Sequence, residues 1–151
     1  MKESGIAVEL RPLTRSDLPR MLDIERSAFT QPWLRTTFEG LIDREDADVI
    51  AAESGDRLLG YAICWTVLDQ AEIGNIAVAP DARRSGIGRL LLDAALARVR
   101  ERGARECFLE VRESNAAARA LYESFGFVVI DRRKRYYTKP VEAAVVMRKE
   151  I

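Results

Sequence analysis

The sequence predicts an α/β fold in which four helices flank a mixed, mostly antiparallel central sheet. Three strand-like apolar segments follow one another in the first half, which favours antiparallel pairing there. In the second half, strand-like segments alternate with helical patterns, so part of the sheet is expected to be parallel. No repeat, low-complexity tract or linker-like change in composition interrupts the 151 residues. We therefore expect a single domain over residues 1–151.

The first half of the chain is expected to contain four strands and two helices. Residues 6–12 (IAVELRP) alternate enough to form a first strand. Thr14 opens the first helix, because T-R-S-D resembles a capping box with Asp in the place of Glu or Gln. Pro32 then breaks the chain before a second helix over 34–42. The next three apolar segments are expected to be strands, over residues 49–53, 58–68 and 71–78.

The second half is expected to contain two helices and three strands. Apolar residues recur at steps of three and four in a long helix that ends at Gly103, namely Leu92, Ala95, Leu96 and Val99. A strand over 106–111 follows, and Asn115 is a favourable N-cap for a helix ending near Ser124. The closing strands are expected over 127–131 and 143–147, which gives the order β-α-α-β-β-β-α-β-α-β-β.

Composition excludes several classes of function. Lys plus Arg and Asp plus Glu are equal at 24 each, so generic binding of nucleic acid is disfavoured. The absence of histidine removes Cys–His and Ser–His catalysis, and no metal site is expected. Cys64 and Cys107 lie in apolar runs and are expected to be reduced, buried thiols without a nucleophilic role.

Hydropathy predicts neither a membrane span nor a secretion signal. The longest apolar stretch, residues 58–68, is far shorter than the roughly 20 residues that a spanning helix requires. The amino-terminal segment lacks the basic-then-apolar shape of a signal peptide. The expected location is therefore cytoplasmic, without membrane binding.

A glycine-containing loop between a strand and a helix is the first candidate binding site. Glycine lets the backbone approach a ligand closely, and free N–H groups at a helix start attract anions. Flanking arginines suit a pyrophosphate, although solvated arginines at an ordinary helix start remain the alternative. Leu91 occupies the third glycine position of the dinucleotide fingerprint, and no Gly-Lys-Ser/Thr follows as in a Walker loop. The candidate residues are Arg83, Arg84, Ser85, Gly86, Ile87, Gly88 and Arg89.

This loop and the strand before it resemble a known family signature. The run N-I-A-V-A-P over 75–80, followed by R-x-x-G-x-G, is similar to the acetyl-CoA pyrophosphate signature of the GCN5-related N-acetyltransferases (GNAT). The resemblance implies the GNAT fold, with a splayed parallel pair of strands at the acetyl-CoA site. It also implies that backbone groups of Ile76, Ala77 and Val78 hold the pantetheine arm. One of their N–H groups would polarise the thioester carbonyl.

A second run supplies candidate catalytic residues. L-E-V-R over 109–112, S-N over 114–115 and later L-Y and G-F resemble the bacterial ribosomal-protein-alanine N-acetyltransferases of the RimI type. Glu110 matches the family's base, Tyr122 the acid that protonates the leaving thiolate, and Asn115 a CoA-contacting asparagine. An acid–base pair of side chains suits the chemistry, because an α-amino group (pKa about 8) must lose a proton before it can attack the thioester. Partial desolvation in an apolar strand would make Glu110 a stronger base.

Each of these residues also has a purely structural alternative. Glu110 could be a solvated charge or pair with Arg112, and Tyr122 could simply pack in the core. Trp33 and Phe38 could wall the acceptor site or pack the second helix.

Two charged segments also leave alternatives open. The basic run 132–135 is interpreted as a solvated hairpin, with attraction of CoA phosphates or an acidic acceptor as the alternative. An acidic stretch is interpreted as a plain surface loop, although it could steer a basic peptide, and comprises Asp43, Glu45, Asp46 and Asp48.

Three features near the carboxyl end depart from the family pattern. Arg135 stands where the family usually has asparagine, and Ala143 stands where an acidic residue is expected. The segment between Tyr137 and Val145 is also short. These residues would border the acceptor groove, so the reaction is better supported than the acceptor.

The resemblance implies an acetyl-CoA-dependent enzyme that acetylates a protein amino terminus by direct attack in a ternary complex. The implied acceptor is the alanine terminus of a small-subunit ribosomal protein. A lysine side chain or small amine is the nearest alternative acceptor. A non-catalytic CoA-binding module and nucleic-acid binding by the arginine-rich loop are the remaining alternatives. The oligomeric state is left open.

Overall fold

The structure is a computed structural model that describes residues 7–151. Its strands are β1 (Glu9–Pro12), β2 (Ala47–Ser54), β3 (Arg57–Val67), β4 (Gln70–Val78), β5 (Glu106–Arg112), β6 (Val128–Thr138) and β7 (Val141–Glu150). Its helices are α1 (Leu18–Ala28), α2 (Arg35–Asp43), α3 (Ile87–Glu101) and α4 (Ala116–Ser124), with 3₁₀ turns η1 (Arg15–Asp17) and η2 (Pro80–Ala82). The predicted order of elements is confirmed.

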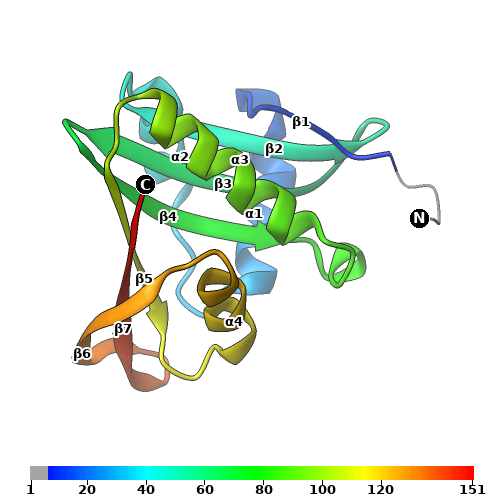
Figure 1. Cartoon of the computed structure of the whole chain (residues 1–151). Helices are drawn as coiled ribbons and strands as arrows, with labels where there is room; N and C mark the ends of the chain where they lie inside the picture. The colour runs from blue at the N-terminus through cyan, green and yellow to red at the C-terminus, as the bar shows by residue number, and fades with distance from the viewer. Residues whose placement is uncertain (1–6) are drawn as a thin grey trace.

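The seven strands form one mixed sheet in the order β1-β2-β3-β4-β5-β7-β6. Every pair is antiparallel except β4 and β5, which run parallel over 70–72 and 106–108. This parallel ladder ends at Glu72 and Phe108, and beyond it the two strands diverge (Figure 1). The predicted parallel, splayed pair in a mostly antiparallel sheet is therefore confirmed.

Helices cover both faces of the sheet (Figure 1). Helix α3 packs on β2, β3 and β4, and its apolar stripe contributes to the larger of two buried clusters. Helices α1 and α2 pack on the other face, where a second cluster forms around Tyr61 and Phe38. Helix α4 lies beside the divergence of β4 and β5. The central strands are thus covered on both faces, whereas β6 at the edge of the sheet is exposed along most of its length.

The boundaries of some elements differ from the prediction. The carboxylate of Asp17 accepts from the Thr14 N–H at 2.8 Å, as a capping box requires, but one 3₁₀ turn precedes α1. Strand β1 starts at Glu9, and Ile6 of the predicted segment lies outside the described residues. Strands β6 and β7 are longer than predicted, because their charged outer halves pair with each other and carry no apolar pattern.

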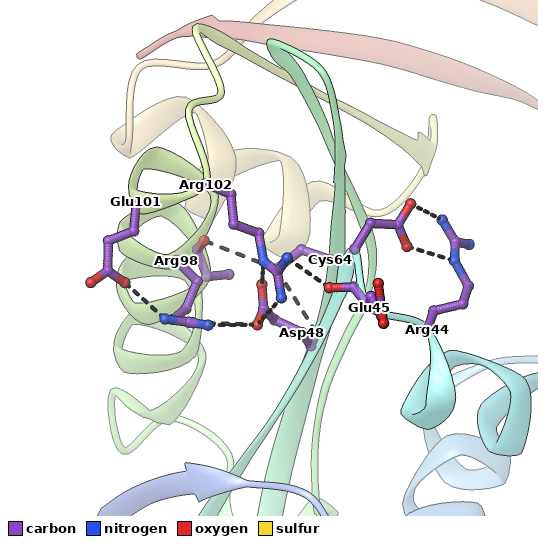
Figure 2. A network of polar contacts seen from close by, with 9 residues as sticks. Arg44, Glu45, Asp48, Cys64, Arg98, Glu101 and Arg102 are labelled. Atoms are coloured by element: carbon purple, nitrogen blue, oxygen red, sulfur yellow. Dashed lines mark hydrogen bonds and ion pairs between the residues drawn. The ribbon is translucent and has the colours of Figure 1, made fainter.

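A cluster of ion pairs fastens the carboxyl end of α3 to β2 (Figure 2). The carboxylate of Asp48 accepts from Arg102 at 2.7 Å and from Arg98 at 3.0 Å, and only 10% of this side chain is exposed. Although burial opposes it, hydrogen bonds from the two guanidinium groups hold the pKa of Asp48 below its usual range. We refer to Asp48, Arg98 and Arg102 as the α3 clamp.

Two other carboxylates of this acidic stretch, and the backbone of a third residue, are also engaged within the protein. Asp43 pairs with Arg15 at 2.6 Å, and Asp46 pairs with Arg44 at 2.8 Å. The carbonyl oxygen of Glu45 accepts from the α3 clamp, at 2.7 Å from Arg102. The acidic stretch is therefore part of the fold, and steering of a basic peptide is not needed to explain it.

Both cysteines are free and fully buried, as expected. Burial raises the pKa of Cys64 and of Cys107 to about 12, so neither thiol ionises near neutral pH. Across residues 7–151 no helix combines the length and the hydropathy that crossing a membrane requires.

Candidate active site

A cavity of about 370 Å³ lies where β4 and β5 part. Its walls come from the α1–α2 loop, β4, β5, the start of α4 and the β6 hairpin. Four residues predicted separately from two sequence runs line it together, namely Ile76, Glu110, Asn115 and Tyr122. The fold therefore brings Ile76 of the acetyl-CoA signature to one cavity with Asn115 and the proposed catalytic pair, whereas Ala77, Val78 and residues 83–89 do not line it.

Strand β4 presents backbone groups along the opened edge. The N–H of Ala79 donates to the Leu59 carbonyl of β3 at 2.7 Å. Because successive N–H groups of a strand point to opposite edges, those of Ile76 and Val78 face away from β3, toward the divergence. The Val78 carbonyl on this edge accepts from the side chain of Arg83 at 3.1 Å. Two N–H groups are thus directed to where the resemblance places the pantetheine arm, and Ala77 points the other way.

The glycine-containing loop leads into the amino terminus of α3. Gly86 adopts φ +83°, which a residue with a side chain rarely adopts, and α3 begins at Ile87. The first helical hydrogen bond runs from the Leu90 N–H to the Gly86 carbonyl at 3.1 Å. The preceding N–H groups have no acceptor within the helix and form a donor set for an anion.

Gly88 has no packing reason to be glycine. A Cβ added there would meet only the Leu121 side chain at 3.6 Å, an ordinary van der Waals contact. A close approach of ligand to backbone is the reason that the family signature gives for a glycine here, and the structure leaves room for it.

The arginines of the loop play different parts. Arg83 holds the Val78 carbonyl, while Arg89 donates to the Ser124 hydroxyl at 2.9 Å and lies over the Phe125 ring at 4.9 Å. The hydroxyl of Ser85 donates to the Ala82 carbonyl. Arg84 is exposed at φ +62°. Two of the predicted arginines therefore also shape the loop, and all three leave positive charge beside the donor set.

Asn115 caps α4 as predicted. Its side-chain oxygen accepts from the Ala118 N–H at 3.1 Å. The amide NH₂ group of the same side chain remains available at the cavity wall. Capping and contact with a ligand are therefore compatible roles for one residue.

Glu110 lies on the cavity side of β5. The burial of this strand alternates, so that Leu109 and Val111 enter the core while Glu110 faces the other way. One carboxylate oxygen lies 3.1 Å from an Arg133 nitrogen, and the other accepts from the Tyr136 hydroxyl at 3.2 Å. The side chain is 23% exposed. The carboxylate is held in place yet remains reachable from the cavity.

Arg112 is not the partner of Glu110, contrary to the alternative suggested by their proximity in sequence. Its guanidinium pairs with Glu142 at 3.1 Å and lies over the Tyr137 ring at 4.2 Å. A further nitrogen donates to the Thr30 hydroxyl at 2.8 Å. Arg112 therefore joins the end of β5 to the β6–β7 hairpin and to the α1–α2 loop.

Tyr122 combines packing with an available hydroxyl. Its ring is 8% exposed and contacts Phe127 edge-on at 5.8 Å, as the packing alternative requires. The same residue lines the cavity. Burial raises the pKa of Tyr122, so the phenol stays protonated at neutral pH and can donate a proton.

The sequence analysis missed Glu25, a fully buried carboxylate at the base of the cavity. It accepts from the Trp33 N–H at 2.8 Å, from the Asn75 amide at 3.1 Å and from the Tyr61 hydroxyl. Burial raises the pKa of Glu25. A signal existed, because Glu25 stands seven residues after Leu18 and so falls on the apolar stripe of α1.

Glu72 was also missed. It is half-buried at the last paired rung between β4 and β5 and lines the cavity. Burial, together with the negative charge of Glu110, raises the pKa of Glu72.

The structure gives different roles to the two aromatic candidates, and it gives partners to part of the basic run 132–135. Trp33 lines the cavity, whereas Phe38 is 1% exposed and packs behind it, with ring centroids 5.5 Å apart. The basic run is not simply a solvated hairpin, because Arg132 pairs with Glu113 at 2.6 Å and Arg133 pairs with the carboxylate of Glu110.

Comparison with known proteins identifies the family. The family model described as "Acetyltransferase (GNAT) family" matches residues 18–127. The chain is 41% identical over 134 residues to the ribosomal protein bS18 alanine N-acetyltransferase of Haemophilus influenzae, covering 87% of this chain and 90% of that protein. Its counterpart from Salmonella typhimurium is 41% identical over 137 residues, covering 89% and 92%.

Solved structures agree with these relatives. The crystal structure of the ribosomal-protein-S18-alanine N-acetyltransferase from Escherichia coli superposes with a TM-score of 0.88 at 38% identity. That match covers 96% of this chain and 94% of the Escherichia coli chain. With its parallel splayed strands, donor loop and shared cavity, the chain belongs to the GNAT family of acetyltransferases.

Proposed function

We propose that this acetyltransferase moves the acetyl group of acetyl-CoA onto the amino-terminal amine of a protein, by direct attack in a ternary complex. The observation that carries the proposal is the single cavity that contains Glu110, Tyr122, Asn115 and the free edge of β4. A covalent acetyl-cysteine route is disfavoured, because both thiols are buried and their pKa values are raised to about 12.

The co-substrate is held by backbone and charge. The N–H groups that precede Leu90 at the start of α3, flanked by Arg83, Arg84 and Arg89, receive the pyrophosphate. The pantetheine arm continues along the opened edge of β4 at Ile76 and Val78, as an added strand would. The Asn115 amide contacts the same arm from α4.

The transfer requires one base, one oxyanion donor and one acid. Glu110, directly or through a water, takes a proton from the acceptor ammonium, and the amine nitrogen then attacks the thioester carbon. A β4 N–H stabilises the oxyanion as the C–N bond forms. When the C–S bond breaks, its electron pair goes to sulfur and the Tyr122 hydroxyl gives the thiolate a proton. The second amine proton is lost to solvent, Glu110 releases the first to solvent, and the Tyr122 phenolate regains a proton from solvent, so that the enzyme returns to its starting state.

The acceptor proposed is the alanine terminus of ribosomal protein bS18, the substrate that the names of the relatives specify. Sequence identity near 40% across most of the chain supports assigning the acceptor of these relatives to this protein. A ribosomal acceptor also implies action in the cytoplasm. An acceptor lysine or small amine is the alternative within the same reaction.

Mass spectrometry of two peptides incubated with acetyl-CoA tests the proposal. One peptide carries a free amino-terminal alanine and no lysine, and the other has a blocked terminus and one internal lysine. We expect acetylation of the first alone. Acetylation of the second alone would contradict the proposed acceptor while leaving the reaction intact.

A CoA-binding measurement covers the remaining outcome. If neither peptide reacts but CoA binds, the proposal of peptide acetylation is wrong and a binding module or another acceptor is indicated. If CoA does not bind either, the assignment of the β4–α3 loop is wrong as well.

A further inference from the structure

A second hollow, which we call the outer groove, adjoins the cavity. It has a volume of about 570 Å³ and shares Trp65, Glu72 and Glu110 with the cavity. Its other walls include Phe108, Val67 and Arg133. A chain whose amino terminus reacts at Glu110 can therefore extend along the outer groove without leaving the protein surface.

The charge of the outer groove is unbalanced. Two carboxylates, Glu72 and Glu110, face one guanidinium, that of Arg133. Arg133 lies 3.1 Å from Glu110 and stacks over Tyr136 at 5.8 Å, so Glu110 is its ion-pair partner and its charge acts on Glu72 only from a greater distance. Among residues 7–151, no Lys or Arg nitrogen lies within ion-pair distance of Glu72, in contrast to Glu110. Glu72 is therefore a half-buried carboxylate without a cation of its own.

Such a group is costly unless a ligand completes it. Burial penalises the ionised carboxylate and the nearby charge of Glu110 adds to the penalty; the charge of Arg133 and the Trp65 side chain oppose it only in part, so the pKa of Glu72 stays raised. A cation brought by the acceptor would relieve both. The neighbouring apolar surfaces of Trp65 and Phe108 suit the methylene stem of arginine or lysine.

We propose that Glu72 is a specificity-determining residue that binds a cationic side chain close to the amino terminus of the acceptor. This proposal rests on the proposed function, because it takes the acceptor to be a polypeptide amino terminus. The acceptor class is therefore a peptide with arginine or lysine among the residues that follow its reacting alanine. An acidic residue at the same position is disfavoured by the two carboxylates.

A position scan of acceptor peptides tests the inference. Each peptide starts with alanine and is otherwise uncharged, and carries either arginine or glutamine at position two, three or four. The measured quantity is the ratio of kcat/KM for the arginine peptide to that for its glutamine partner. We expect a ratio of about ten at one position, and a ratio near one there in Glu72→Gln.

Two further variants make the ratio interpretable. Glu101→Gln removes an exposed α3 carboxylate that pairs with Arg98 outside the groove, and we expect it to keep the wild-type ratio. Glu72→Lys is expected to reverse the preference, so that a glutamate peptide exceeds the arginine peptide. A purely structural role for Glu72 would not reverse it. Thermal midpoints and CoA affinity check that each variant is folded.

Three outcomes would overturn the inference. The first is that arginine gives no advantage at any position, and the second is that the advantage survives in Glu72→Gln. The third is a fall in kcat by the same factor on all peptides with the ratio preserved, which would place Glu72 in proton transfer. Failure of the proposed function differs from all three, because no peptide would then be acetylated at its amino terminus while CoA still binds.

Discussion

The carboxylates of this protein fall into two groups that differ in how many cations face them. In the α3 clamp, Asp48 is matched by both Arg98 and Arg102 (Figure 2). In the cavity, by contrast, the only ion pair that residues 7–151 form with Glu25, Glu72 or Glu110 is the one between Glu110 and Arg133 of the outer groove.

The pKa directions follow from that difference. Hydrogen bonds from arginine, opposed by burial, lower the pKa of Asp48, whereas burial raises the pKa of Glu25 and of Glu72. A carboxylate that is fully paired with cations, which we call saturated, stabilises the fold and has no free capacity to bind a ligand. A buried carboxylate that lacks such cations, which we call unsaturated, lowers the free energy of unfolding and can still bind a proton or a cation.

The largest effect on stability is expected at Glu25. Among residues 7–151 no cation pairs with this carboxylate, as for Glu72, but its oxygens are fully hydrogen-bonded, like those of the carboxylate in the α3 clamp. Glu25→Ala leaves the Trp33 N–H, the Asn75 amide and the Tyr61 hydroxyl without an acceptor. We expect a loss of about 3 kcal/mol in the free energy of unfolding.

Urea denaturation measures this loss, with Glu39→Ala as the control. Glu39 forms an exposed pair with Arg35, so its removal should change stability by about 0.5 kcal/mol or less. Equal effects of the two variants would contradict the role given to the Glu25 network.

A smaller effect, on activity alone, is expected at Tyr122. Tyr122→Phe keeps the ring that packs on Phe127 but removes the hydroxyl that would protonate the thiolate. We expect kcat to fall about 10²-fold, with little change in the thermal midpoint. Steady-state kinetics with a peptide acceptor measure it, and an unchanged kcat would leave Tyr122 as a packing residue only.

The pH dependence of stability should differ in sign between the two groups. Asp48 has a lowered pKa in the folded state, so it contributes stability above about 3.9 that is lost as pH falls. Glu25 has a raised pKa, so its stability cost appears as pH rises above about 4.3.

Urea denaturation between pH 3 and 8 tests both signs. Asp48→Asn should flatten the acid side of the profile, and Glu25→Gln should flatten the side toward neutral pH. Each effect amounts to about 1.4 kcal/mol per unit of pKa difference. Slopes of the same sign for both residues would contradict the comparison.

The smallest effect is expected in the β6 hairpin, which carries Arg133 to the outer groove. Arg135 adopts φ +56°, a conformation that asparagine tolerates better than arginine. This gives a physical reason for the asparagine that the family usually has there. Arg135→Asn should stabilise the protein by about 0.5–1 kcal/mol, while Lys134→Asn, without a positive φ, should not. Thermal denaturation distinguishes the two.

Local signals were enough to predict the elements that build the acetyl-CoA site. The glycine-containing loop at the start of α3, the cap at Asn115 and the apolar run of β5 each act over a few residues, and all three were confirmed as structure. The placement of Glu110 and Tyr122 in one cavity follows from the fold that the resemblance implied. Their chemical roles remain predictions.

The polar environment of the site could not be predicted, because it depends on contacts between distant segments. Glu25 meets Asn75 across 50 residues, and Arg133 reaches Glu110 through a register shift between β6 and β7. Neither leaves a periodic pattern in the sequence. Arg112, the neighbour in sequence, was the obvious partner for Glu110, yet it faces Glu142.

The most direct test of the comparison is to neutralise one carboxylate of each group and to measure kcat, thermal midpoint and CoA affinity together. Glu110→Gln should lose about 10²–10⁴-fold in kcat and keep its midpoint and CoA affinity. Asp48→Asn should keep kcat and lose several degrees in its midpoint. If Glu110→Gln retains full kcat, or if the two variants lose activity and stability alike, the division between the cation-paired carboxylate of the α3 clamp and the carboxylates of the cavity is wrong.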